Sequence, residues 1–171
     1  MNNRENQIAI KDYNRTFEKD INALMLRQWN ESFRHKDKFF GKIALVNNEF
    51  AGVCYGYPQN NYFYLDEICV VEKFRNQGLA SSMLEKLIFD LNTNDQKWGG
   101  VRTHLLDNDG SGPELPRSKH LFEKFGFEFK KIIPNYFAKC NNYDYCPDCG
   151  HKPCICSGWE YELKFQCNKR S

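Results

Sequence analysis

The fold is decided by residues 65–80, which read Leu65-Asp66-Glu67-Ile68-Cys69-Val70-Val71-Glu72-Lys73-Phe74-Arg75-Asn76-Gln77-Gly78-Leu79-Ala80. The first half continues an apolar run that starts at Tyr62, and this run predicts a strand over 62–71. After Gly78, apolar residues recur at three- and four-residue spacing and predict an amphipathic helix: Leu79, Met83, Leu84, Leu87, Ile88 and Leu91. The sequence therefore predicts a strand that enters a helix through a short turn.

This turn carries the features of a phosphate-binding site. The first N–H groups of a helix have no partner within the helix and carry partial positive charge, so they attract a pyrophosphate. Gly78 has no Cβ and Ala80 has a small side chain, which lets a ligand approach the backbone. Arg75 adds a guanidinium whose fork suits phosphate oxygens. A glycine alone also fits an ordinary turn, and it is the combination that indicates a phosphate site.

Working outward, the other apolar patterns predict a mixed α/β chain. The expected strands are 8–10, 39–46, 50–57, 98–106 and 158–165, with Asn47-Asn48 as a turn and 127–139 as an extended segment. The other expected helices are 17–29 and 118–125, the latter ended by Gly126. We expect an α/β fold with one central, mostly antiparallel sheet and flanking helices.

Length and composition limit the alternatives. With 171 residues, the chain is expected to form a single domain, 1–171, with a small cysteine-rich insert at 140–157. The composition, 41% apolar and 27% charged, is typical of a globular protein. The formal net charge of +2 gives no argument for nucleic acid or an anionic membrane as a partner. The absence of a signal-like or membrane-spanning apolar run leads us to expect a cytoplasmic, reducing location.

Two segments resemble the GNAT superfamily of N-acetyltransferases. Residues 65–80 resemble the acetyl-CoA motif of this family, whose signature is Arg/Gln-x-x-Gly-x-Gly/Ala. Residues 120–127, His120-Leu121-Phe122-Glu123-Lys124-Phe125-Gly126-Phe127, resemble the family segment Leu-Tyr-x-Lys-x-Gly-Phe. The resemblance covers roughly residues 40–130. It implies the GNAT-like acyl-CoA N-acyltransferase fold, whose splayed strands would hold the pantetheine arm between strands 62–71 and 98–106.

The resemblance also implies an activity and a set of coenzyme contacts. The chain would be an acyltransferase that moves acetyl directly from acetyl-CoA to a primary amine, with a general base. The implied acetyl-CoA contacts are Cys69, Val70, Val71, Arg75, Asn76, Gln77, Gly78, Leu79, Ala80, Ser81, Phe122 and Lys124. Among them, the backbone N–H of Val70 is the expected donor to the thioester oxygen.

Two carboxylates are candidates for the base. An alkylamine with a pKa of about 10 must lose a proton before it attacks. Asp66 is the first choice, because polyamine acetyltransferases have their proposed base at the matching position, and Glu67 is the second. Strand alternation would point the two side chains to opposite faces. Binding of a cationic substrate or capping of a loop is an equally good interpretation of either carboxylate.

The second motif departs from the family at Phe122, where many relatives carry a tyrosine that protonates the leaving thiolate. Phenylalanine has no proton to give. A thiol pKa of about 8.5 lets the thiolate depart without full protonation, so activity is still expected. Whether another general acid exists stays open; Tyr136 is a candidate that the sequence does not place.

A cysteine cluster predicts a structural zinc site. The pattern Cys146-x2-Cys149-x4-Cys154-x-Cys156 holds four thiols at chelating spacings, and four thiolates suit tetrahedral Zn²⁺. Cys140 and His151 are possible replacements among the ligands. Surface thiols and a redox-sensitive dithiol are the alternatives.

Three functions compete at this stage. The first is acetylation of a small cationic metabolite or antibiotic. The second is acetylation of a protein N-terminus or lysine, and the third is a non-catalytic acyl-CoA-binding module. The expected partners are acetyl-CoA and a small amine, without nucleic acid or membrane; the oligomeric state stays open, a homodimer included. Four tyrosines either line an acceptor pocket or pack the sheet: Tyr55, Tyr57, Tyr62 and Tyr64.

Overall fold

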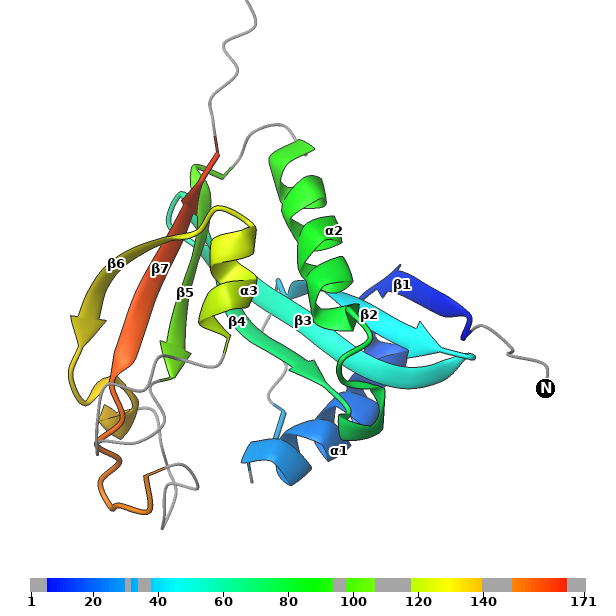
Figure 1. Cartoon of the computed structure of the whole chain (residues 1–171), viewed down its shortest axis with the longest axis horizontal. Coiled ribbons are helices and arrows are strands. Elements are labelled where there is room, and N and C mark those ends of the chain that lie inside the picture. Colours follow the sequence, from blue (N-terminus) through cyan, green and yellow to red (C-terminus); the bar gives the residue numbers. More distant parts are fainter. Residues whose placement is uncertain are drawn as a thin grey trace, which may run out of the picture. The chain divides into compact units, whose positions relative to one another are not determined.

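The computed structural model describes residues 6–29, 32–33, 38–93, 98–106, 118–139 and 149–165. The chain divides into two compact units, Met1–Trp98 and Gly99–Ser171 (Figure 1). The first contains β1 (Ile8–Asp12), η1 (Arg15–Phe17), α1 (Glu18–Trp29), β2 (Phe40–Val46), β3 (Glu49–Gln59), β4 (Tyr62–Val70), η2 (Glu72–Phe74) and α2 (Leu79–Thr93). The second contains β5 (Gly100–Leu106), α3 (Lys119–Lys124), β6 (Glu128–Ile133), η3 (Tyr136–Lys139) and β7 (Gly158–Lys164).

Strands β1 to β4 of the first unit pair with their sequence neighbours, and every pairing is antiparallel. Asn47 and Asn48 connect β2 to β3 with φ of 51° and 66°, and Val46 pairs with Glu49. Two left-handed residues form the tight turn whose twist matches a hairpin, and asparagine tolerates this conformation. The predicted turn is therefore confirmed.

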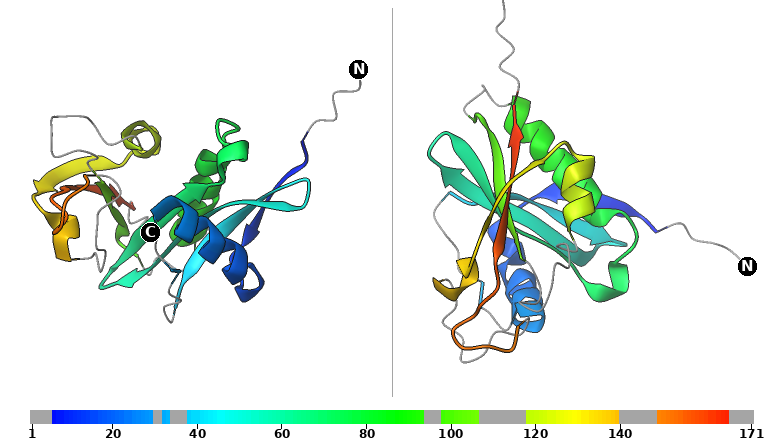
Figure 2. Two further views of the ribbon diagram at one scale, coloured as in Figure 1. Left: turned by 90° about the horizontal axis from the view of Figure 1, so that it is seen from below. Right: turned by 60° about the vertical axis from the view of Figure 1, so that its left-hand side comes forward.

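The two helices of the first unit cover opposite faces of this sheet (Figures 1 and 2). Ile43 belongs to a buried cluster with α1 residues, which include Ile21, Leu24 and Met25. The next residue back along β2, Lys42, is fully buried and contacts Asp90 of α2. Because neighbouring residues of a strand point to opposite faces, α1 and α2 must lie on opposite sides.

The apolar stripe of α2 is buried as its spacing predicts. Five of its six predicted members are at most 3% exposed, and the sixth, Ile88, is half-buried; the five are Leu79, Met83, Leu84, Leu87 and Leu91. Burying such side chains removes apolar area from water and contributes about 25 cal/mol per Å². This packing fixes α2 against the sheet and therefore fixes the start of α2 relative to the end of β4.

The second unit has β7 between β5 and β6, with both pairings antiparallel. Alternate residues of β7 divide into an apolar face with Tyr161 and Leu163 and a polar face with Glu160 and Glu162. Helix α3 contributes the buried ring of Phe122.

The expected extended segment 127–139 is wrong over its last residues. Strand β6 ends at Ile133, and Tyr136–Lys139 form the 3-10 helix η3. Pro134 has no N–H to donate to a neighbouring strand, and Asn135 adopts a left-handed φ of 53°, so the strand cannot continue.

The order of strands and α-helices, as predicted from the sequence, is confirmed, and so is the mixed α/β class. Within the portion of the chain that the structure describes, no helix combines the length and apolar character needed to span a membrane.

Candidate functional site

The predicted phosphate turn lies between η2 and α2 in the first unit. Gly78 has a left-handed φ of 77°, and a Cβ added to it would meet nothing within 4 Å. Its carbonyl accepts the N–H of Ser82 at 3.0 Å, so Gly78 is the N-cap that precedes the first residue of α2. Asn76 also has a positive φ, of 62°. The backbone at Gly78 is therefore exposed on the side where a side chain would normally stand, which fits the close approach of a ligand.

The start of α2 suits an anion electrostatically. Helix α2 has 15 residues, and its first turn contains no acidic side chain. A helix of this length places a partial positive charge at its N-terminus, where the amides preceding Ser82 have no partner within the helix. A pyrophosphate could accept several of these N–H groups at once. The residues present thus fit the diphosphate of coenzyme A.

Arg75 lies beside this turn and is held by two hydrogen bonds. Its Nε donates to the carbonyl of Val70 at 3.2 Å, and its Nη2 donates to Oε1 of Gln28 at 2.8 Å. A guanidinium has five N–H donors, so these two bonds leave donors for a phosphate. The side chain of Gln77 accepts from Asn6 at 3.4 Å.

The direction of the backbone N–H groups in and after β4 distinguishes among Cys69, Val70 and Val71, the three residues considered as donors to the thioester oxygen. The N–H of Val71 donates to the carbonyl of Ala51 in β3 at 2.8 Å. Successive N–H groups along a strand point in alternate directions, so the N–H of Val70 points away from β3. By the same alternation, the N–H of Cys69 points toward β3, as that of Val71 does. The geometry therefore leaves Val70, and not Val71, as the residue whose N–H is directed away from the β3 ladder.

Asp66 and Glu67 lie at a β-bulge. In β3, the consecutive residues Gly56 and Tyr55 pair with Leu65 and Glu67, so Asp66 is the extra residue. Simple alternation, which we expected to send the two carboxylates to opposite faces, does not hold across a bulge. Asp66 is exposed, whereas Glu67 is half-buried and accepts the N–H of Ile68 at 3.1 Å.

The thiol of Cys69, two residues further along β4, is poorly suited to act as a nucleophile. Burial, together with the negative charge of Glu67, raises the pKa of Cys69 to about 12. The thiolate, which is the reactive form, is therefore scarce at neutral pH. This favours direct transfer to the amine over an acetylated cysteine on β4.

The second motif lies on α3, in the Gly99–Ser171 unit. Phe122 is 1% exposed and packs edge-to-face on Phe127, with ring centroids 5.1 Å apart. The Nζ of Lys124 lies 5.6 Å from the centroid of the Phe125 ring, and Lys124 is exposed. Tyr161 of β7, which the sequence analysis had not singled out, has a buried hydroxyl with no hydrogen-bond partner among the described residues.

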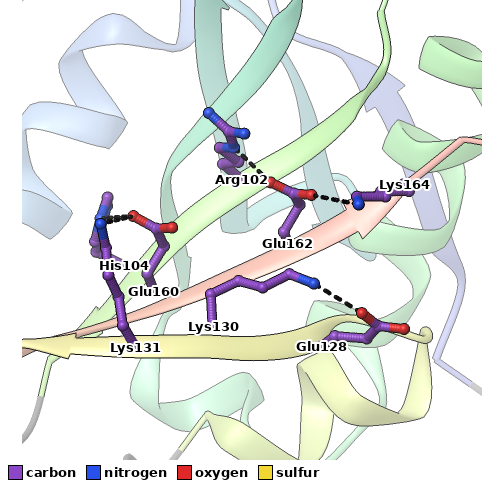
Figure 3. Close-up of polar contacts among 8 residues, drawn as sticks. All are labelled: Arg102, His104, Glu128, Lys130, Lys131, Glu160, Glu162 and Lys164. Atoms are coloured by element: carbon purple, nitrogen blue, oxygen red, sulfur yellow. Dashed lines mark hydrogen bonds and ion pairs between the residues drawn. The ribbon is translucent and has the colours of Figure 1, made fainter.

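Figure 3 shows a polar array on β5, β6 and β7 that the sequence analysis missed. Arg102 donates through Nε to Oε2 of Glu162 at 2.6 Å, across the β5–β7 pair. Nε2 of His104 lies 3.3 Å from Oε2 of Glu160, which faces it on β7. Lys131 and Lys164 extend the array on either side. Alternating polar residues in β5 and β7 were the available signal, but the sequence does not give the register that joins them.

His104 is a titratable group of this array, and its pKa is shifted. Burial lowers its pKa, while the carboxylate of Glu160 opposes the change. The imidazole also stacks on Tyr136 of η3, with centroids 4.2 Å apart and planes inclined by 17°. A buried imidazole that is neutral near pH 7 can accept a proton, and its neighbouring carboxylate can stabilise the product.

The structure brings together three of the four predicted zinc ligands. The Sγ atoms of Cys149, Cys154 and Cys156 all lie within 4.8 Å of one another. Cys146 and Cys140 lie outside the described residues. His151 is exposed, donates through Nδ1 to the carbonyl of Cys149 at 2.5 Å, and is not a member of the three-thiol group.

Comparisons with known proteins bear on the family and the fold of this chain. The sequence profile of the acetyltransferase (GNAT) family matches residues 6–127. The Escherichia coli ribosomal-protein-S18-alanine N-acetyltransferase superposes with a TM-score of 0.73 at 14% identity, covering 96% of this chain and 99% of that one. Arabidopsis thaliana NAA60 in complex with a bisubstrate analogue gives 0.70 at 9% identity, covering 94% and 100%. A Bacillus subtilis acetyltransferase in complex with CoA gives 0.66 at 15%, covering 95% and 100%.

No curated protein sequence matches the chain. The structural relatives, all below 25% identity, show the shared fold. The family profile spans well over half of the residues and includes the Gly78 turn. The chain therefore belongs to the acetyltransferase (GNAT) family and is an acyltransferase.

Proposed function

We propose that this protein transfers the acetyl group of acetyl-CoA to the primary amine of a small cationic molecule, a metabolite or an antibiotic. The observation that carries the proposal is the pair Asp66 and Glu67 at the bulge of β4, on the strand that leads into the Gly78 turn. One residue of this pair is exposed and the other half-buried. Two adjacent carboxylates attract an ammonium group and can also take its proton.

In this proposal, the backbone from Asn76 to Ser81 binds the diphosphate of the coenzyme, and Arg75 adds positive charge. Support comes from the left-handed Gly78, from the open space beside it and from the first turn of α2, which has no acidic residue. The remaining coenzyme contacts that we propose are Cys69, Val70, Val71, Phe122 and Lys124. Phe122 would act through its place in the core of the second unit rather than through a polar contact.

The chemical step requires a neutral amine and a stabilised oxyanion. Asp66 is our proposed base and removes the proton from the substrate ammonium, with Glu67 as the second choice. The amine nitrogen then forms a bond to the carbonyl carbon, and the N–H of Val70 donates to the oxygen that gains charge. The nitrogen releases its second proton to water as the carbon–sulfur bond breaks, and the thiolate leaves with the electron pair, so the products are the neutral amide and the coenzyme thiolate.

No side chain at position 122 can protonate this thiolate. A thiol pKa of about 8.5 makes the thiolate an adequate leaving group in neutral water, so the reaction does not depend on a tyrosine at this position. The ring of Tyr136 in η3 stacks on the imidazole of His104 in β5. We therefore propose no protein group as the general acid.

The rings near the carboxylates give mixed support for a small cationic acceptor. Tyr57 and Tyr64 pack with centroids 5.3 Å apart, on the strand pair that carries the bulge. Aromatic faces attract ammonium groups. Tyr55, in contrast, is 7% exposed and belongs to the core beneath α1, so it contributes to packing.

A protein N-terminus is the second candidate acceptor. The structural relatives include an Arabidopsis thaliana Naa50 in complex with the bisubstrate analogue CoA-Ac-MVNAL, as well as the S18-alanine enzyme. An α-amino group has a pKa of about 7.7 to 8.0, so it needs less help from a base than an alkylamine does.

We also propose that the protein works in the cytoplasm. No step of the proposed reaction uses a metal ion.

An acetyl-transfer assay tests the proposal. Release of the coenzyme thiol is followed with polyamines, aminoglycosides, peptides with free N-termini and peptides with an internal lysine, each product being verified by mass spectrometry. We expect turnover with a small polyamine or aminoglycoside above that with any peptide. Turnover with N-terminal peptides alone would replace the first candidate by the second. Binding of acetyl-CoA without transfer to any acceptor would contradict both.

A further inference from the structure

The three sulfurs near one end of β7 have the spacing of ligands that share a metal ion. Sγ of Cys149 and Sγ of Cys154 are 3.9 Å apart, and the Sγ of Cys156 completes a group no wider than 4.8 Å. A Zn–S bond of about 2.3 Å with tetrahedral angles separates two bound sulfurs by about 3.8 Å. A disulfide would require about 2.05 Å. The separation therefore matches shared coordination rather than a covalent bridge.

The surroundings of the sulfurs also suit a closed metal site. Cys154 and Cys156 are at most 4% exposed, and the N–H of Cys156 donates to Sγ of Cys154 at 3.4 Å. Such a donor stabilises a thiolate that is bound to a cation. Leu106 and Phe137 cover the sulfurs with apolar surface. Thiolates are soft ligands and select zinc over the hard cations that oxygen ligands bind.

The thiols are connected by direct contacts to the polar array of the same unit. The N–H of Phe137 donates to the carbonyl of Cys156 at 3.5 Å, and its ring packs on the sulfurs. The neighbouring Tyr136 lies against Gly158, where an added Cβ would come within 2.7 Å of its ring. That ring also packs edge-on against Phe137, with centroids 4.9 Å apart, and stacks on His104. These contacts form one continuous path from the sulfurs to the imidazole.

We propose that the thiolates of Cys149, Cys154 and Cys156 bind one structural Zn²⁺ ion, which fastens η3 to the start of β7 and so holds Tyr136 over His104. One further ligand completes the tetrahedron, and each thiol releases its proton when the metal binds. The site goes beyond acetyl transfer and does not depend on it. Metal content can be measured whether or not the protein acetylates an amine.

The first test is the metal content of the full chain, purified with a reductant and without a chelator. We expect about one zinc ion per chain. The variants Cys154→Ser and Cys149→Ser should lose the metal, whereas Cys54→Ala should keep it, because Cys54 is a buried thiol of the other unit. Because Cys149 is only half-buried, the Cys149→Ser variant should still fold, so a loss of metal in this variant is not explained by misfolding. With cobalt in place of zinc, a sulfur-to-metal charge-transfer band should appear in the wild type and weaken in Cys149→Ser.

The second test measures amide hydrogen exchange with the metal present and after chelation. We expect the segments 136–139 and 149–157 to exchange at least tenfold faster without metal, while α2 stays unchanged. Three results would overturn the proposal: a reduced chain that takes up no zinc, a Cys149→Ser variant that binds zinc as the wild type does, or a disulfide between Cys149 and Cys154 that persists in the protein purified with a reductant. Zinc binding without any change in exchange at η3 would overturn the fastening role.

Discussion

The Gly78 turn and the polar array around His104 are two candidate sites built in opposite ways. At the turn, the useful groups belong to the backbone: the left-handed Gly78 and the amides at the start of α2. In the array, the useful groups are side chains brought from β5, β6 and β7, with Tyr136 of η3 stacked on His104. A backbone site depends on which residues allow the chain to take a conformation, whereas a side-chain site depends on strand register and packing. The first should respond to a change in backbone access, and the second to the loss of single side chains.

The largest effect on coenzyme binding is expected at the turn itself. Gly78→Glu places a charged side chain where the diphosphate would approach, so affinity for coenzyme A should fall by at least about 100-fold. Isothermal titration calorimetry measures this change. Gly126→Glu is the matched control, because Gly126 is also exposed and left-handed, with φ of 81°. Equal losses of affinity in the two variants would mean that strain and charge, and not the site, explain the effect.

The bulge tests whether side-chain chemistry adds to the backbone site. Asp66→Asn keeps the shape and removes the base, so kcat should fall about 10²- to 10⁴-fold with little change in affinity for acetyl-CoA. Glu67→Gln serves as the comparison and should cost less. A higher KM for the amine with unchanged kcat would show that Asp66 binds the cation without taking its proton.

A smaller effect is expected at the buried lysine that ties α2 to the sheet. Burial alone would lower the pKa of Lys42, but its hydrogen bonds to Asp12 and Asp90 outweigh this and raise it. Lys42→Met should reduce the free energy of unfolding by about 1–3 kcal/mol. Lys73→Met, which removes an exposed pair with Glu49, should cost no more than about 1 kcal/mol. Denaturant titrations compare the two. Coenzyme affinity should change less than in Gly78→Glu, because Lys42→Met leaves the backbone donors in place.

The smallest effect concerns the array. Burial lowers the pKa of His104 in the folded state below its ordinary value of 6.5. The unfolded chain then binds more protons, so the contribution of His104 is fully present above about pH 6.5 and is lost as the pH falls through the lowered folded pKa. His104→Gln should flatten this part of the stability profile. His120→Gln is the control, since His120 is 87% exposed. An unchanged slope in His104→Gln would contradict the burial of a neutral imidazole.

The contrast between the two sites also explains what could be read from the sequence. The turn was predictable because Gly78 and Ala80 are required by local conformation, and the strand before them and the helix after them have distinct periods. Helix α2 was placed correctly for the same reason. These signals lie within one short stretch of chain, so no knowledge of tertiary pairing was needed.

The array and the bulge were not predictable by the same means. His104 meets Glu160 only because β5 and β7 pair in one register, and the two residues are far apart in the sequence. The bulge at Asp66 appears only in the pairing with β3. The end of β6 was also missed, although Pro134 and Asn135 gave a local signal for it. The spacing of the cysteines, in contrast, was enough to predict that Cys149, Cys154 and Cys156 would converge.

The binding of coenzyme A at the start of α2 is tested most directly by amide hydrogen exchange of the wild-type protein with and without coenzyme A. The amides of residues 78–81 precede the first hydrogen bond of the helix, which Ser82 donates to Gly78. Because water is their ordinary partner, they should exchange fast in the absence of ligand. We predict that saturating coenzyme A slows exchange at residues 76–81 more than anywhere else in the first unit. Unchanged exchange at these residues, with the coenzyme bound and protection found elsewhere, would contradict the assignment of the turn.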